Sequence, residues 1–211
     1  MDEALLIWGA ALAAYILFRA WYDNWRGPLS TNEIERFVAA IAGTPGAAVN
    51  DLAIVRRFLE EDDGREFFML NLVRENPNDA PDPETGAMVP GRILTQRYAK
   101  AFMPALFARA GHPAIVARPA GGYLDAWNAA PDPGWSVVGY MRYRSRRDMA
   151  ALASDPRFHH IHPFKIAGVA QTFSFPTRPM IRTLLGPRVW IALLLALIAA
   201  LTHLARLTLF A

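Results

Sequence analysis

The sequence contains no cysteine and almost no lysine. All but two of its 22 basic residues are arginine, the exceptions being Lys100 and Lys165. Without cysteine the chain cannot form a disulfide framework, a thiolate nucleophile or a thiolate metal site. The arginine excess accompanies a composition rich in alanine and proline, which indicates compositional bias of the genome. We therefore give the number of arginines little functional weight.

The common catalytic and nucleotide-binding motifs are also missing. The chain has no Gly-x-Gly-x-x-Gly fingerprint, no P-loop, no Gly-x-Ser-x-Gly turn and no His-Glu-x-x-His pair. One basic cluster could bind phosphates, and it consists of Arg142, Arg144, Arg146 and Arg147. No aromatic stacking motif of an RNA-binding module accompanies it, so we expect no nucleic-acid partner. A solvated face, or attraction to anionic lipid headgroups, accounts better for these charges.

Two long apolar segments lie at the ends of the chain, at residues 4–22 and 188–207. About 20 apolar residues suffice for a helix to cross a bilayer. A cleaved signal peptide would begin with basic residues, whereas Asp2 and Glu3 precede the first segment, which favours a permanent anchor. A buried core helix would show a polar face, and none is present between Val189 and Leu201. The sequence therefore predicts two transmembrane helices.

The arginines beside these segments predict how the chain is oriented in the membrane. Five lie on the side of the central region, namely Arg19, Arg26, Arg178, Arg182 and Arg188. Only Arg206 lies on the other side. Because cytoplasmic flanks carry the excess of arginine and lysine, the central region is predicted to be cytoplasmic and both termini to lie outside. The predicted location is a bacterial-type inner (cytoplasmic) membrane.

A helical preface is predicted at residues 30–64, ahead of the main domain. Ser30 and Glu33 have the spacing of a capping box, in which each side chain bonds to the other residue's backbone. Apolar residues follow at helical period until Gly43. A second short helix beginning near Leu52 ends before Gly64.

The central region at residues 66–176 is predicted to be an α+β domain. The run Phe67–Val73 is apolar on both faces, as expected of a central strand. The long loop 74–91 is typical of a lid, a partner contact or disorder. The remaining predicted elements are a helix at Leu94–Ala110 that Pro104 should kink or restart, strands at Pro113–Arg118, Gly122–Trp127 and Trp135–Tyr143, a helix at Arg146–Ser154 and a strand at Val169–Phe175. This order is the βαββαβ ferredoxin-like plan with one extra short strand.

The order of several short motifs in this region resembles the dimeric α/β-barrel superfamily. They are the MLNLV strand, a tyrosine-bearing helix, the AR-PAGG-Y turn, W-x-V-x-G-Y-x-R-Y-x-S-R-x-D-M and a closing S-D-P-x-F block. The similarity is greatest to a small uncharacterised branch of that superfamily. The resemblance implies that two ferredoxin-like sheets pair face to face, and that each protomer has a pocket between sheet and helices. Members include cofactor-free oxygenases, isomerases and haem-handling enzymes. The two anchors and the helical preface depart from the family pattern.

Five polar or amphipathic residues are candidates for the lining of that pocket, namely Asn71, Tyr98, Arg118, Tyr140 and Arg142. Asn71 interrupts an apolar strand, and a buried amide must find hydrogen-bond partners. A bond across the sheet or the dimer interface is the favoured interpretation. Tyr98 is equally well explained as a core aromatic residue.

The segment Arg157–Pro163 carries three histidines, His159, His160 and His162. Neutral imidazole can bind zinc, copper, iron or haem. A firm metal site needs three or four ligands, and no carboxylate at a suitable spacing completes this set. We therefore expect a surface turn whose histidines bond locally, and no cofactor.

Two functions of different class fit these features. The favoured one is a membrane-anchored, non-enzymatic accessory or interaction subunit whose cytoplasmic domain forms a homodimer or joins a larger membrane assembly. The alternative is a cofactor-independent oxygenase or isomerase that acts on an apolar, membrane-dissolved substrate such as a quinone-like ring.

Overall fold

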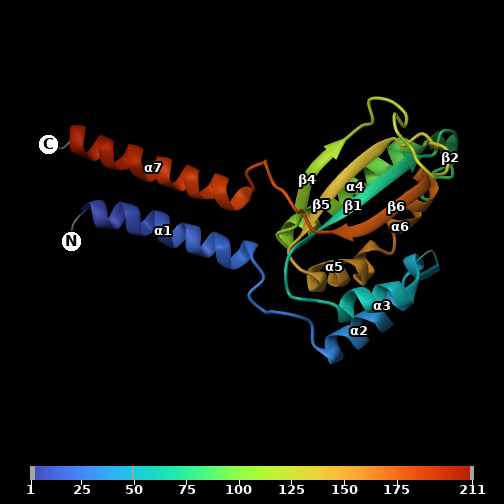
Figure 1. The fold of residues 1–211 in the computed structure, drawn as a ribbon, viewed down its shortest axis with the longest axis horizontal. Helices are drawn as coiled ribbons and strands as arrows, with labels where there is room; N and C mark the ends of the chain where they lie inside the picture. The colour runs from blue at the N-terminus through green and yellow to red at the C-terminus, as the bar shows by residue number, and fades with distance from the viewer. Residues whose placement is uncertain (1–2, 49, 210–211) are drawn as a thin grey trace. The chain divides into compact units, whose positions relative to one another are not determined.

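The computed structural model describes residues 3–48 and 50–209, which form two compact units (Figure 1). One unit combines residues 1–25 with residues 179–211, and the other spans Arg26–Arg178. Each unit is described separately.

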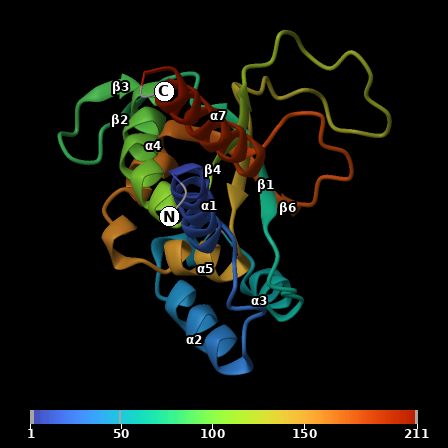
Figure 2. The ribbon, with the colours of Figure 1, turned by 90° about the vertical axis from the view of Figure 1, so that its left-hand side faces the viewer.

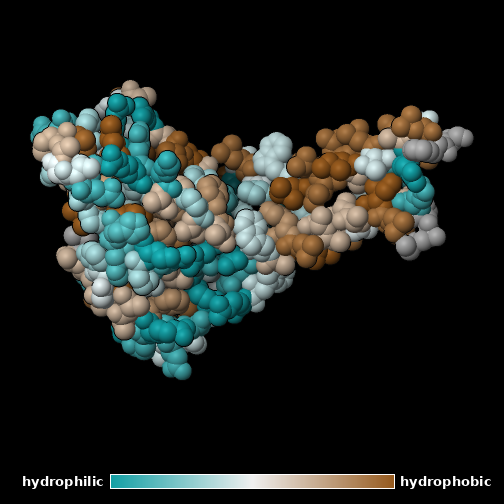
Figure 3. Space-filling view, turned by 180° about the vertical axis from the view of Figure 1, so that it is seen from behind, coloured by the Kyte–Doolittle hydropathy of each residue, from teal (hydrophilic) through white to brown (hydrophobic). Residues whose placement is uncertain are grey.

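The first unit is a pair of apolar helices, α1 (Glu3–Tyr22) and α7 (Pro187–Leu209), which run side by side (Figures 1 and 2). Their mean hydropathies are 1.7 and 2.0, so both are long and apolar enough to cross a membrane. Figure 3 shows a largely hydrophobic surface over both helices. Polar contacts join them at each end. Arg206 Nε donates to Glu3 Oε2 at 3.0 Å, and Arg188 Nε donates to Asp23 Oδ1 at 2.8 Å.

The second unit is built on a four-stranded, entirely antiparallel sheet with the strand order β4-β5-β1-β6. The strands are β1 (Phe67–Glu75), β4 (His112–Ala117), β5 (Val137–Tyr143) and β6 (Val169–Thr177). As predicted, the apolar strand β1 is central. A separate hairpin consists of β2 (Asp79–Pro81) and β3 (Met88–Pro90). The sheet and the helices together make a mixed α+β domain.

Three helices, α4 (Gly91–Ala108), α5 (Arg146–Ala153) and α6 (His162–Gly168), cover one face of the sheet. Alternate residues of β1, beginning with Phe67 and Met69, point toward these helices. The Phe67 ring stacks on Tyr143 with a centroid distance of 5.3 Å. The buried partners from the helical layer include Leu94, Leu106, Leu152, Phe158 and Phe164.

The predicted helical preface is present as α2 (Thr31–Ala42) and α3 (Leu52–Glu60), with the 3₁₀ turn η1 (Pro45–Ala48) between them. The capping box of Ser30 and Glu33 is confirmed. Ile34, Ile41 and Leu59 bury their side chains against Ala150 of α5. The preface therefore extends the helical layer and does not cover the other face of the sheet.

The segment that enters the domain before α2 is held by buried polar contacts. Arg147 donates from Nη1 to the carbonyl oxygen of Gly27 at 3.1 Å and from Nη2 to that of Pro28 at 2.9 Å. Its Nε also donates to Glu33 Oε1 at 2.9 Å. Gly64 has a φ of +74°, and a Cβ there would lie 2.7 Å from the carbonyl carbon of Gly27. Backbone therefore packs against backbone at this point, which requires glycine.

Four local expectations were wrong or incomplete. The predicted strand Gly122–Trp127 is irregular, because Asp132 accepts from Tyr123 N at 3.2 Å and closes the segment into a loop. The helix α4 continues through Pro104, so the helix does not restart there. The loop 74–91 contains the hairpin β2–β3, and α6 and the 3₁₀ turn η2 (Pro156–Phe158) were not predicted.

Candidate functional site

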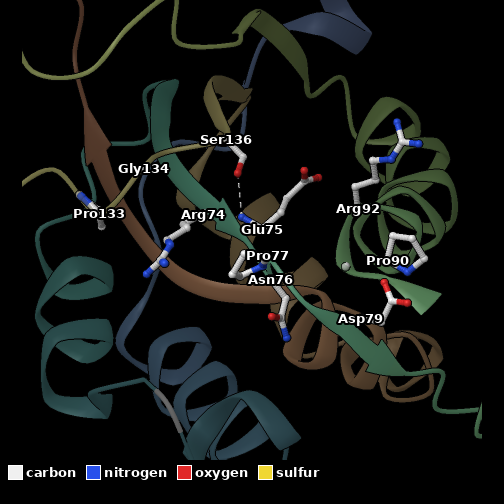
Figure 4. Close-up of a pocket in the computed structure, with 11 residues that line it drawn as sticks. Arg74, Glu75, Asn76, Pro77, Asp79, Pro90, Arg92, Pro133, Gly134 and Ser136 are labelled. Carbon is white, nitrogen blue, oxygen red and sulfur yellow. Dashed lines mark hydrogen bonds between the residues drawn. The ribbon is translucent and has the colours of Figure 1, made fainter. Parts of the chain in front are cut away.

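A cavity of about 490 Å³ lies beyond the end of β1, where the chain turns toward the β2–β3 hairpin (Figure 4). It is bordered by the start of α4 and by the segment that leads into β5. Its lining residues are Arg74, Glu75, Asn76, Pro77, Asp79, Pro90, Gly91, Arg92, Pro133, Gly134 and Ser136. Most of these residues are charged or polar.

Hydrogen bonds fix the central residue of this cavity, Glu75. Its backbone N–H donates to Ser136 Oγ at 3.0 Å, and Thr95 Oγ1 donates to its Oε1 at 2.8 Å. The pairing of β1 with β6 shifts register between Arg74 and Glu75. Such irregularities redirect side chains at the end of a strand. Figure 4 shows the Glu75 carboxylate directed toward α4, whereas Arg74 extends on the side of Pro133.

The floor of the cavity depends on a close approach between glycines. Asn76 N donates to the carbonyl oxygen of Gly168 at 2.8 Å. A Cβ on Gly91 would lie 2.8 Å from the Asn76 carbonyl oxygen and 2.9 Å from that of Gly168. The backbones at the start of α4 and the end of α6 are therefore in contact, which restricts movement of this floor.

The charges that line the cavity are largely uncompensated. Within the described residues, the side chains of Arg74, Arg92 and Asp79 take part in no hydrogen bond or ion pair. In contrast, Arg97 on the same helix as Arg92 forms an ion pair with Asp82. The cavity thus offers donors and acceptors to a ligand.

The second candidate is the face of the sheet opposite the helices, which we call the open face. It consists of Leu70, Leu72, Ile115, Val138, Tyr140, Phe173 and Phe175, which the strand registers place on one side. Phe173 and Phe175 are 54% and 48% exposed. An exposed face of an antiparallel sheet normally carries polar side chains. Contiguous apolar surface of this kind is typical of an interaction site.

The five predicted pocket residues are not brought together, and none of them lines the cavity. Asn71 points to the helical side, where its Oδ1 accepts from Ser174 Oγ of the neighbouring strand at 2.8 Å. Tyr98 packs between α4 and α6, and burial raises its pKa to about 12. Tyr140 lies on the open face, and Arg118 is exposed beyond β4.

The arginine cluster is not a solvated or lipid-facing surface as the sequence analysis expected. Arg142, Arg146 and Arg147 are 1%, 8% and 7% exposed. Arg142 forms an ion pair with Glu66 at 2.8 Å, and Arg146 lies 3.7 Å from Asp62. These side chains hold segments of the domain together, because a buried guanidinium requires such partners.

His162 begins α6, whereas His159 and His160 lie between η2 and α6, and two of the three histidines turn inward. His162 is half-buried with its ring at 72° to that of Tyr98, and its Nδ1 lies 3.3 Å from the Phe158 carbonyl oxygen. Burial lowers the pKa of His162. His160 is exposed, whereas the Nε2 atom of His159 is buried without a hydrogen bond. Across the described chain, no group of three histidine or acidic residues could hold a metal ion.

The cavity residues were missed because no local pattern marks them. Arg74 and Glu75 end a strand, Arg92 begins a helix, and Ser136 precedes another strand. Only the unusual length of the loop 74–91 indicated that this region could be functional.

Comparison with known proteins identifies the fold but no family. No protein-family model matches the chain, and no curated protein matches its sequence. A crystal structure of a protein of unknown function from Rhodopseudomonas palustris has a TM-score of 0.52 at 19% identity. The match covers 63% of this chain and 96% of that one. A structure of the methylated form of that protein gives a TM-score of 0.53 at 19% identity, with coverages of 64% and 96%. The shared feature is a mixed α/β domain.

Proposed function

We propose that this protein is a two-pass membrane protein whose cytoplasmic domain pairs with a second copy, and that it serves as a non-enzymatic accessory or interaction subunit of a membrane assembly. The order β1-α4-β4-β5-α5-β6, which leaves out the β2–β3 hairpin and α6, and the strand order β4-β5-β1-β6 support the ferredoxin-like plan that we propose for the domain. In the dimeric α/β barrels that the sequence resembles, two such sheets pack face to face.

The open face is the observation that carries this proposal. Its members are apolar, and the preface helices α2 and α3 pack on α5 instead of on this face. A symmetric pair of such faces would bury the exposed phenylalanines of both copies. Burial of apolar area stabilises the pair by about 25 cal/mol per Å² before the cost of association is subtracted.

The membrane part of the proposal rests on composition. The helices α1 and α7 have the length and hydropathy of spans. The arginines flanking them are concentrated on the side of the central domain, which supports a cytoplasmic domain and external termini in a bacterial-type inner membrane.

The enzymatic alternative receives less support from the cavity. An apolar, membrane-dissolved substrate requires an apolar pocket. The cavity beyond β1 is lined mainly by charged and polar residues. It is therefore better suited to a polar ligand.

Single-cysteine cross-linking tests the pairing, because the native chain has no cysteine that would react. Leu72→Cys and Val138→Cys each place one thiol on the open face. In the full-length protein in detergent, we expect a short bis-maleimide to link each variant into covalent dimers. The added substitution Phe173→Glu should greatly reduce this product, because it would bury a charge in the interface.

Met88→Cys provides the matched control. Met88 is 61% exposed on β3, outside the open face. If the open-face variants cross-link no better than Met88→Cys at equal concentration, the open face does not pair with a second copy. A monomer at all concentrations would likewise refute the dimer.

A further inference from the structure

We infer that the cavity beyond β1 binds a small zwitterion, a molecule that carries an amino group together with a carboxylate or phosphate group. The volume of about 490 Å³ lies in the range of small-molecule sites. This inference does not rest on the proposed membrane anchor or on the proposed dimer, although alternation along β1 places Arg74 on the same side of the sheet as Leu72, at the end of the open face.

Arg74 supplies the main argument for an anionic group. It is half-buried on the central strand and, within the described residues, has no partner. Several other arginines of the domain that are shielded from solvent are paired, such as Arg144 with Asp148 and Arg147 with Glu33. A guanidinium that is partly removed from water loses hydration, and an oxyanion restores the lost interactions. Its fork of donors matches a carboxylate or a phosphate.

Two carboxylates in the same cavity argue against a simple anion. Glu75 uses one oxygen to accept from Thr95, and Asp79 has no side-chain partner among the described residues. With Arg74 and Arg92, the four side chains carry two positive and two negative formal charges. An anion without donors would be repelled by the carboxylates, and a simple cation by the guanidiniums. A ligand that carries both charges satisfies both sets of groups.

The walls of the cavity are preformed by the fold. Asp132 Oδ1 accepts from Gly134 N at 2.9 Å and fixes the segment beside Arg74. The backbone contact of Gly91 with Asn76 fixes the opposite side. Binding therefore requires little ordering of the protein, which favours measurable affinity for a small ligand.

Isothermal titration calorimetry on the full-length protein in an uncharged detergent tests this inference. The probes are L-serine, O-phosphoethanolamine, inorganic phosphate and ethanolamine. We expect at least one zwitterion to bind at one saturable site, about 10-fold or more tightly than phosphate or ethanolamine. Preference for L-serine would identify a free amino acid as the source of the ligand, and preference for O-phosphoethanolamine a lipid-type headgroup.

Two substitutions locate the site. Arg74→Gln removes the charged donor and should weaken zwitterion binding about 10- to 100-fold. Because Arg74 has no partner within the described chain, circular dichroism should show an unchanged fold. Arg118→Gln makes the same charge change at an exposed position outside the cavity and should leave the affinity unchanged.

The inference is overturned if neither zwitterion binds, if phosphate alone binds as tightly, or if Arg118→Gln weakens binding as much as Arg74→Gln. None of these outcomes depends on whether the protein is a dimer. The cross-linking and binding experiments therefore fail or succeed independently.

Discussion

Replacement of Arg147 by methionine should destabilise the domain by removing a buried junction between α5, α2 and the entering segment. The Arg147 side chain is 9% exposed and that of Glu33 is 16% exposed. The variant preserves most of the apolar volume of the side chain but removes the more buried of the two cations that pair with Glu33, and the exposed Arg26 remains at 3.3 Å. It also removes the hydrogen bonds that Arg147 donates to the carbonyl oxygens of Gly27 and Pro28. Loss of one partner of a shielded ion pair costs more than the pair contributes.

The magnitude follows from the pKa of Glu33. The hydrogen bond from Arg147, followed by that from the Ser30 backbone, lowers the pKa of Glu33 from 4.5 to about 2. At about 1.4 kcal/mol per tenfold change, this corresponds to roughly 3 kcal/mol. The part of this shift that comes from Ser30 remains in the variant, and water that reaches the partly exposed carboxylate screens the interaction, so we expect about 1 to 2 kcal/mol at pH 7. The melting temperature should fall by about 2 to 8 °C.

The effect should depend on pH in a defined direction. Because the folded pKa of Glu33 is depressed, its contribution is fully present above pH 4.5 and is lost as the pH falls toward about 2. Arg147→Met should therefore differ from the wild type most at neutral pH, and the difference should shrink in acid. Urea unfolding of residues 26–178, at one fixed protein concentration and followed by circular dichroism, measures both quantities.

Arg56→Met is the matched control. Arg56 also bonds Glu35 through both of its terminal nitrogens and connects α3 to α2, but the two side chains are 37% and 56% exposed. We expect a much smaller effect, because exposed pairs contribute little. If Arg147→Met is no more destabilising than Arg56→Met, the buried contacts of Arg147 do not stabilise the domain more than an exposed ion pair does.

Three further predictions concern packing, the histidine turn and the membrane. Gly168→Ala should destabilise the domain by about 1 to 3 kcal/mol in urea unfolding, because its Cβ would lie 2.8 Å from the Gly91 carbonyl oxygen and 2.9 Å from Leu94 Cβ. An effect below that range would mean that α4 and α6 can separate without cost. Because burial lowers the pKa of His162, the folded state resists its protonation, and stability should fall as the pH drops below about 6.5. His162→Gln should flatten this dependence of stability on pH, whereas His160→Gln, at an exposed position, should not. Equal pH profiles for both variants would show that His162 is not the cause of the pH dependence. A reporter fused to either terminus should read as external, and a cytoplasmic reading at both termini would reverse the proposed orientation.

Features set by neighbouring residues could be predicted from the sequence. The two apolar helices follow from uninterrupted runs of apolar side chains, and the start of α2 follows from the spacing of Ser30 and Glu33. The central position of β1 follows from a run that is apolar on both faces. Each of these patterns lies within about 20 residues, so local propensity and periodicity are sufficient to reveal it.

Features that depend on distant residues were decided only by the tertiary structure. Arg147 and Glu33 are separated by 114 positions, so nothing local distinguishes this buried arginine from a solvated one. The cavity likewise joins the ends of a strand, a helix and a loop, and only the folded chain shows that the Arg74 side chain there forms no hydrogen bond or ion pair with any other described residue. The alternation of β1 places Leu70 and Leu72 on one face, but only the packing of α2 and α3 on α5 leaves that face open. Sequence thus determined the elements and their apolar sides, whereas the long-range pairing of charges and layers determined which surfaces remain available for binding.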